Sequence, residues 1–124
     1  NGVPNRPVAA ELYRAGVDVR WCDTHGEQCH AKFLLHRTPD GASLILGSGN
    51  WTRRNLDDLN LEMDVQLVAP AAHPAVQDAA AWFGETWRNE SGRRYSVDYA
   101  RYRDDGLAHR LWYRAGEATG FSTW

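Results

Sequence analysis

The stretch CHAKFLLHRTPDGASLILGSGNW, residues 29–51, decides how the chain folds and where its chemistry lies. Apolar and polar residues flank the turn signal TPDG, which predicts two antiparallel strands, residues 29–36 and 42–48. His30 and Lys32 stand two apart in the first strand, and Ser48 and Asn50 close the second. Because a hairpin folds back on itself, we expect these two pairs to meet at one end of it.

The residues outside the hairpin predict an α/β fold. The pattern over residues 6–16 predicts a helix that ends at Gly16 and has Val8, Leu12 and Ala15 on one face. The other expected elements are two strands (17–22 and 61–68), a loop or short helical turn (50–60) and a second helix with Pro74 in its first turn (73–87). The tail, residues 95–124, shows no clear periodicity. This order predicts a mixed β-sheet layered with helices.

Composition is that of an ordinary soluble globular protein and predicts a single domain, residues 1–124. Hydrophobic residues make up 43% of the chain and charged residues 24%, with a net charge of −2. Near-neutral charge argues against a broad nucleic-acid footprint, since such domains usually carry a strongly basic face. No apolar run approaches the ~20 residues that span a bilayer. The chain begins with Asn1, so we expect it to be processed or cut from something longer, and the compartment stays open.

The two cysteines leave two interpretations open. Cys22 and Cys29 either close a short loop in an oxidising compartment or remain thiols in the cytosol. Neither has a metal-ligand neighbour at zinc-site spacing, so no metal site is expected. Four histidines have no partner pattern and are expected to be structural or surface residues: His25, His36, His73 and His109.

His30 and Lys32 are the first candidate site residues. In a strand, residues two apart point to the same face, so the imidazole and the ammonium would lie side by side. Ala31, Phe33 and Leu35 would then fill the opposite face. An imidazole can act as nucleophile or base, and an ammonium can hold an anionic oxygen. The alternative is that both side chains simply face solvent on an edge strand.

Ser48 and Asn50 stand in GSGN, where the glycines let the backbone approach an anion closely. Strand pairing across the TPDG turn would place Gly47 near the start of the first strand, beside the His–Lys pair. Alone, GSGN is most often an ordinary turn. Together, the four polar side chains would form a compact cationic pocket suited to a phosphate or sulfate ester. Trp51, next to Asn50, is a candidate wall of that pocket.

Glu62 is a third element of the candidate site, at the start of the expected strand, with Leu61 and Met63 on the opposite face. A carboxylate near a catalytic histidine can accept its Nδ1 proton, which fixes the tautomer and leaves Nε2 to attack. An exposed strand glutamate is the alternative. Arg53 and Arg54 follow the turn and either contact a phosphate or form a solvated pair.

Three segments together, HAKF (30–33), GSGNWT (47–52) and NLEMDV (60–65), resemble the phospholipase D superfamily. The signature of that superfamily is His-x-Lys, four residues, Asp, six residues and Gly-Ser-x-Asn. The resemblance extends from the first helix through the FGETW helix. It implies a mixed sheet between helices, in the form of a phospholipase D-like half-domain.

One position departs from this signature. Arg37 stands where the family places its aspartate after Lys32, whereas Asp40 keeps the family spacing to Gly47. An extension of the hairpin turn by three residues explains both distances. Asp40 is then a displaced counterpart of the motif aspartate, and the other motif positions are intact.

The resemblance implies a phosphodiesterase that needs no metal or cofactor. One histidine attacks phosphorus to give a phosphohistidine, and a second protonates the leaving alcohol. It implies these roles: catalytic, His30, Lys32, Asn50 and Glu62; substrate-binding, Gly47, Ser48 and Trp51. Because two half-sites must meet, a second motif is expected from the missing half of a two-motif enzyme or from a dimer partner. By analogy with C-terminal halves, His30 is the general acid; in a homodimer it plays either role.

Phospholipid is the preferred substrate class, hydrolysed or transferred as in cardiolipin-synthase-like enzymes. The near-neutral charge and the six tryptophans favour phospholipid slightly over DNA. A metal-independent nuclease that uses the same residues is one alternative. A non-catalytic binding or dimerisation module is another, because the motif spacing is altered and the second motif is missing.

Overall fold

The computed structural model describes residues 5–56, 61–104 and 106–119. The chain divides into two compact units, one built from its two ends (1–23 with 96–124) and one from residues 24–95. Each unit is described by itself, and the prediction of one domain stays a prediction. The elements in chain order are α1 (Asn5–Arg14), β1 (Arg20–Cys22), β2 (Phe33–Thr38), β3 (Gly41–Gly47), α2 (Arg53–Leu56), β4 (Asp64–Ala69), α3 (Pro74–Arg88), β5 (Ser96–Asp98), the 3-10 turn η1 (Tyr99–Tyr102) and α4 (Leu107–Thr119).

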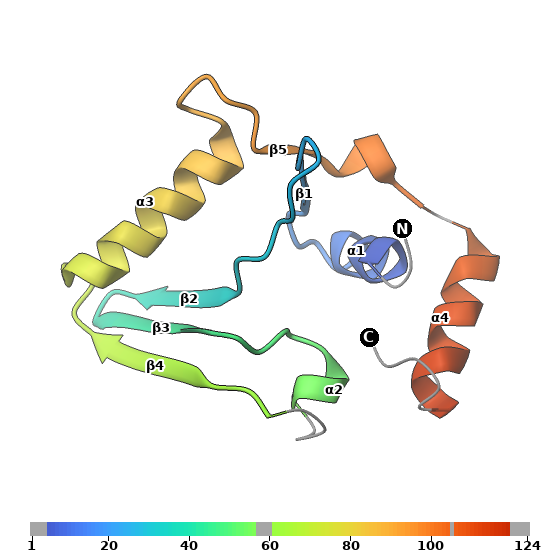
Figure 1. Cartoon of the computed structure of the whole chain (residues 1–124), viewed down its shortest axis with the longest axis horizontal. Helices are drawn as coiled ribbons and strands as arrows, with labels where there is room; N and C mark the ends of the chain where they lie inside the picture. The colour runs from blue at the N-terminus through green and yellow to red at the C-terminus, as the bar shows by residue number, and fades with distance from the viewer. Residues whose placement is uncertain (1–4, 57–60, 105, 120–124) are drawn as a thin grey trace. The chain divides into compact units, whose positions relative to one another are not determined.

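The unit of residues 24–95 is built on a three-stranded antiparallel sheet in the order β2-β3-β4 (Figure 1). Thr38 pairs with Gly41, so Pro39 and Asp40 alone form the turn, as the TPDG signal predicts. The middle strand buries Leu44, whose side chain is only 2% exposed. The turn is therefore tight, and the longer turn expected from the motif spacing is not found.

Helix α3 packs on this sheet through aromatic side chains. The ring of Phe33 on β2 meets the rings of Trp82 and Phe83, with centroids 5.6 and 6.4 Å apart. Val76 is fully buried, and the helix begins at Pro74 as predicted. The helix ends at Asn89, which adopts the left-handed conformation with φ 59° and donates its backbone N–H to the carbonyl of Glu85.

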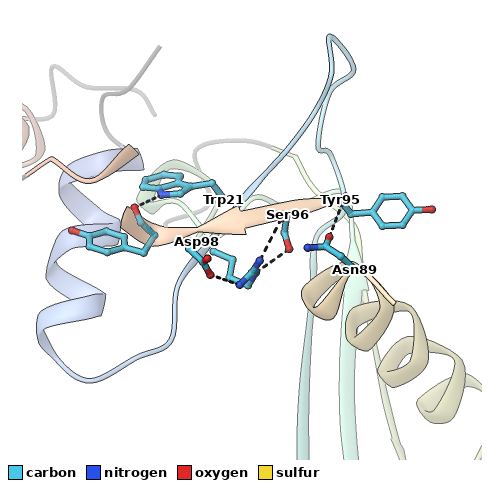
Figure 2. A network of polar contacts seen from close by, with 7 residues as sticks. Trp21, Asn89, Tyr95, Ser96 and Asp98 are labelled. Atoms are coloured by element: carbon cyan, nitrogen blue, oxygen red, sulfur yellow. Dashed lines mark hydrogen bonds and ion pairs between the residues drawn. The ribbon is translucent and has the colours of Figure 1, made fainter. Parts of the chain in front are cut away.

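The unit formed by the chain ends pairs β1 with β5 in an antiparallel ladder. Figure 2 shows the polar contacts around it: the Trp21 indole N–H donates to the Tyr99 carbonyl at 2.9 Å. The guanidinium of Arg20 donates to Ser96 Oγ at 3.0 Å and forms an ion pair with Asp98. Just before β5, within the unit of residues 24–95, the Tyr95 N–H donates to Asn89 Oδ1 at 2.7 Å. Ala9, Ala10 and Tyr99 form the core of this unit, with Val19 and Trp21 packed against it.

The α/β fold class is confirmed, with three differences in detail. All pairings of the described strands are antiparallel, whereas a mixed sheet was expected. Strand β1 pairs with β5 and not with the hairpin. Of the residues expected to share one face of α1, Leu12 is 44% exposed; the buried residues of this helix are the small ones, Pro7, Ala9 and Ala10. The tail contains β5 and α4, which no local pattern indicated. Gly16 ends α1 as predicted, with φ +85°.

Cys22 and Cys29 are both disulfide-bonded, so neither is a free thiol in the structure. Within the described ranges, no helix combines the length and the apolar character that a membrane span requires.

Candidate active site

The GSGN turn continues the ladder between β3 and β4 beyond the end of both strands. Ser48 N–H donates to the Met63 carbonyl at 3.1 Å, and Met63 N–H donates to Ser48 Oγ at 3.1 Å. The Ser48 hydroxyl then donates its own proton to Glu62 Oε2 at 2.7 Å. Ser48 is therefore held by its backbone and its side chain, and its hydroxyl holds Glu62 at the turn.

The other carboxylate oxygen of Glu62 has a partner that sequence reasoning missed. Asn55, in the single-turn helix α2, donates its Nδ2 to Glu62 Oε1, and its Oδ1 accepts from Thr52 Oγ1 at 3.0 Å. The only signal in the sequence is the asparagine-rich character of residues 50–60, which says nothing about which asparagine reaches Glu62. A prediction of this contact would have required the geometry of α2.

Gly47 and Gly49 are glycines because Asp64 occupies the space beside them. Asp64 is the register partner of Gly47, and its Oδ1 accepts the Gly49 N–H at 3.1 Å. A Cβ on Gly49 would lie 2.6 Å from Asp64 Oδ2, and a Cβ on Gly47 would overlap Asp64 and the Met63 carbonyl. Neither glycine has a positive φ, so the backbone conformation alone would allow a side chain at either position. The lack of room beside Asp64 is what excludes one.

His30 and Lys32 lie just before β2, which begins at Phe33, so the expected strand face does not extend to them. The Lys32 ammonium donates to the backbone carbonyl of His30 at 2.9 Å. Phe33 pairs with Leu46, so the segment that carries His30 lies at the same end of the hairpin as Gly47 and the turn. The His30 side chain is exposed and makes no hydrogen bond to Ser48, Asn50 or Glu62 in the described structure.

The remaining candidates are placed as follows. Asn50 and Trp51 are exposed at the turn, and the Asn50 carbonyl accepts the Thr52 N–H at 2.7 Å. Trp51 is 51% exposed. Asp40 lies in the two-residue turn at the opposite end of the hairpin from His30. The side chains of Arg53 and Arg54 lie outside the described structure.

The four histidines set aside by the sequence take no part in this site. Three make contacts elsewhere: His25 with the Arg94 carbonyl, His73 as the N-cap that accepts from the Ala75 N–H, and His109 with Asp104. His36 lies exposed on β2. In the part of the chain that the structure describes, no three His, Cys, Asp or Glu side chains gather as a metal site would need.

Comparison with known families matches residues 3–87 to a family model described as cardiolipin synthase, PLD-like domain. The match covers more than half of the chain, so the chain belongs to this family and, with it, to the phospholipase D superfamily. No curated protein and no solved structure gave a match. The family match confirms the resemblance seen in the motif segments, all of which lie within the matched residues.

Proposed function

We propose that this chain supplies one half of a phosphodiesterase site of the phospholipase D type, which hydrolyses or transfers phospholipid phosphodiesters. The observation that carries the proposal is the placement of the His30–Lys32 segment and the GSGN turn at the same end of the β2–β3 hairpin. Family membership supports the substrate class, since the matching family model is described by a phospholipid-synthesising enzyme.

The proposed reaction has two steps, each of which exchanges one bond at phosphorus. In the first, an imidazole nitrogen forms a P–N bond while the P–O bond to the leaving alcohol breaks, and a second imidazolium gives its proton to the departing oxygen. In the second, the now neutral imidazole takes a proton from water or another alcohol. The oxygen of that molecule forms a new P–O bond as the P–N bond breaks.

Each candidate side chain has a role in these steps. Lys32, by its positive charge, and Asn50, by hydrogen bonds from its amide, stabilise the negative charge on the non-bridging oxygens. The transition state needs this electrostatic stabilisation. Glu62 accepts the Nδ1 proton of an imidazole. Its two oxygens already accept from Ser48 and Asn55, but each oxygen has further lone-pair capacity. Ser48 and Gly47 shape the turn, and Trp51 stands beside it.

The reaction needs a second histidine of the same kind, and this chain carries one motif. We propose that the second half-site comes from another half-domain of the same protein or from a second copy of this chain. In the first case His30 is the general acid. In a homodimer, His30 of one copy is nucleophile and its counterpart is acid.

The test is release of headgroup from phosphatidylcholine vesicles by the assembled protein and its His30→Ala variant. Loss of an acid–base or nucleophilic imidazole should lower turnover by about 100-fold to 10,000-fold. His36→Ala is the matched control, because His36 is exposed on the same strand pair but takes no part in the site. Its turnover should match the parent, and circular dichroism should show both variants folded.

Three results would reject this function or redirect it. Turnover unchanged by His30→Ala refutes the mechanism. Nicking of plasmid DNA without added metal, in place of headgroup release, assigns the same residues to a nuclease. Absence of both activities in the assembled protein assigns the chain to a binding or dimerisation role.

A further inference from the structure

A chain of side-chain hydrogen bonds joins the segment after Asn50 to Glu62. Thr52 Oγ1 donates to Asn55 Oδ1 at 3.0 Å, Asn55 Nδ2 donates to Glu62 Oε1, and Ser48 Oγ donates to Glu62 Oε2 at 2.7 Å. Both oxygens of the carboxylate are therefore held, one from each side. The Ser48 contact belongs to the motif, whereas the Asn55 contact comes from a residue outside it.

The backbone of α2 sets the position of Asn55. The N–H groups of Asn55 and Leu56 both donate to the Thr52 carbonyl at 3.0 Å, and the Thr52 N–H donates to the Asn50 carbonyl at 2.7 Å. The turn therefore starts at the residue that the proposed site uses to bind the phosphoryl group. Through this single helical turn, Asn55 connects Asn50 to the carboxylate of Glu62.

The Thr52 hydroxyl also decides which way the Asn55 amide points. A hydroxyl that donates to Oδ1 leaves the NH₂ group on the other side, where Glu62 Oε1 accepts it. Glu62 is otherwise an exposed residue with a long, flexible side chain. Donors on both oxygens restrict the rotation of the carboxylate about its last bond and leave its other lone pairs in fixed directions.

We propose that Asn55 is a positioning residue for Glu62 and that Thr52 fixes the orientation of its amide. The proposal rests on the proposed function, in which Glu62 accepts the Nδ1 proton of an imidazole. In this role Asn55 acts by holding the carboxylate of Glu62 in one orientation, and not by contact with the reacting atoms. A neutral amide suits this position, because an aspartate there would place a second negative charge against Glu62.

The first test compares turnover of phosphatidylcholine vesicles by variants of the assembled protein. Asn55→Ala should lower kcat by about 10-fold to 100-fold, the range typical of residues that orient a functional ligand, and leave KM within about twofold. Asn55→Asp should lower kcat further, and Thr52→Val should lower it less. Gln66→Ala is the control, since it removes an amide–hydroxyl hydrogen bond to Ser43 on the same sheet, outside the site; its kcat should not change.

The second test asks whether Asn55 acts through Glu62. In a Glu62→Ala background, Asn55→Ala should change kcat by less than about twofold, because the group it positions is gone. A residue that merely stabilises the fold would lower kcat equally in both backgrounds. That result, or a kcat unchanged by Asn55→Ala alone, overturns the inference.

The third test reads the contact without activity. The side-chain amide resonance of Asn55 in a ¹H–¹⁵N spectrum should move on Glu62→Ala and on Thr52→Val, but not on Gln66→Ala. An unresponsive resonance overturns the inference. A parent protein without turnover, whose Asn55 resonance does respond to Glu62→Ala, refutes the proposed function and the catalytic role of Asn55, and it leaves the contact established.

Discussion

Asp64 stands opposite Gly47 in the β3–β4 register, and its carboxylate reaches past that glycine to accept the Gly49 N–H. One acidic side chain therefore occupies the space that a Cβ at either glycine would need. The two glycines differ in what surrounds them. The three atoms nearest to a Cβ on Gly49 all belong to the movable carboxylate of Asp64, whereas a Cβ on Gly47 would also meet the backbone carbonyl of Met63.

This difference predicts that the costs of two alanine substitutions depend differently on Asp64. Gly49→Ala should destabilise the protein by about 1–2 kcal/mol, because Asp64 must move and release the Gly49 N–H. In an Asp64→Ala background, Gly49→Ala should cost little more. Gly47→Ala should remain destabilising in both backgrounds, since backbone cannot withdraw as a side-chain end can. Urea unfolding measures all five variants, and equal costs of Gly49→Ala in both backgrounds would contradict the model of a shared space.

Phe33 joins the hairpin to α3, and the stability of this unit should depend on it. Phe33→Ala removes the ring that contacts Trp82 and Phe83, so the free energy of unfolding should fall by about 2–4 kcal/mol. Phe33→Leu keeps most of the apolar volume and should cost less than half as much. Thermal unfolding followed by near-UV circular dichroism checks both values. A Phe33→Ala variant as stable as its parent would show that α3 does not depend on this contact.

Much of the hairpin and the convergence of its ends could be predicted because the signals are local. The TPDG turn and the alternation beside it determine the register, and the register brings Gly47 back toward the His30–Lys32 segment. The strand starts were less predictable. Residues 29–32 and 61–63 have the same apolar–polar pattern as the strands they precede, and only the partners available to their backbone groups decide where pairing stops.

Two other features have no local signal at all. The three residues of β5 pair with β1 across most of the chain length, and a segment that short has no period to detect. Asn55 reaches Glu62 because α2 turns it back toward the strand, and any asparagine in residues 50–60 looks the same in sequence. The buried residues of α1 were also hard to predict. Ala9 and Ala10 form one buried cluster with Tyr99, and a hydrophobic pattern gives alanine less weight than leucine.

The Asp104 carboxylate makes the start of α4 sensitive to acid. The Gly106 backbone N–H, and after it the His109 imidazole, hold the pKa of Asp104 below its ordinary value. A carboxyl with a lowered folded-state pKa contributes stability that is complete above its ordinary pKa near ~4 and is lost as the pH falls toward the lowered value. Helicity should therefore decline below about pH 4 in the parent. Asp104→Asn should flatten this part of the profile in a circular-dichroism titration; a parent curve with no change there would contradict the assignment.

Asp40 provides the last prediction, because it keeps the motif spacing to Gly47 and yet lies in the turn at the far end of the hairpin from His30. A carboxylate placed there cannot assist the chemistry proposed for the other end. Asp40→Ala should therefore leave headgroup release within about twofold of the parent, while His30→Ala lowers it by about 100-fold or more. Asp40→Asn serves as a second variant that keeps the turn-forming side chain, so that a loss of folding can be separated from a loss of chemistry. If both variants fold and both lose turnover, Asp40 has a catalytic role that the hairpin register does not explain.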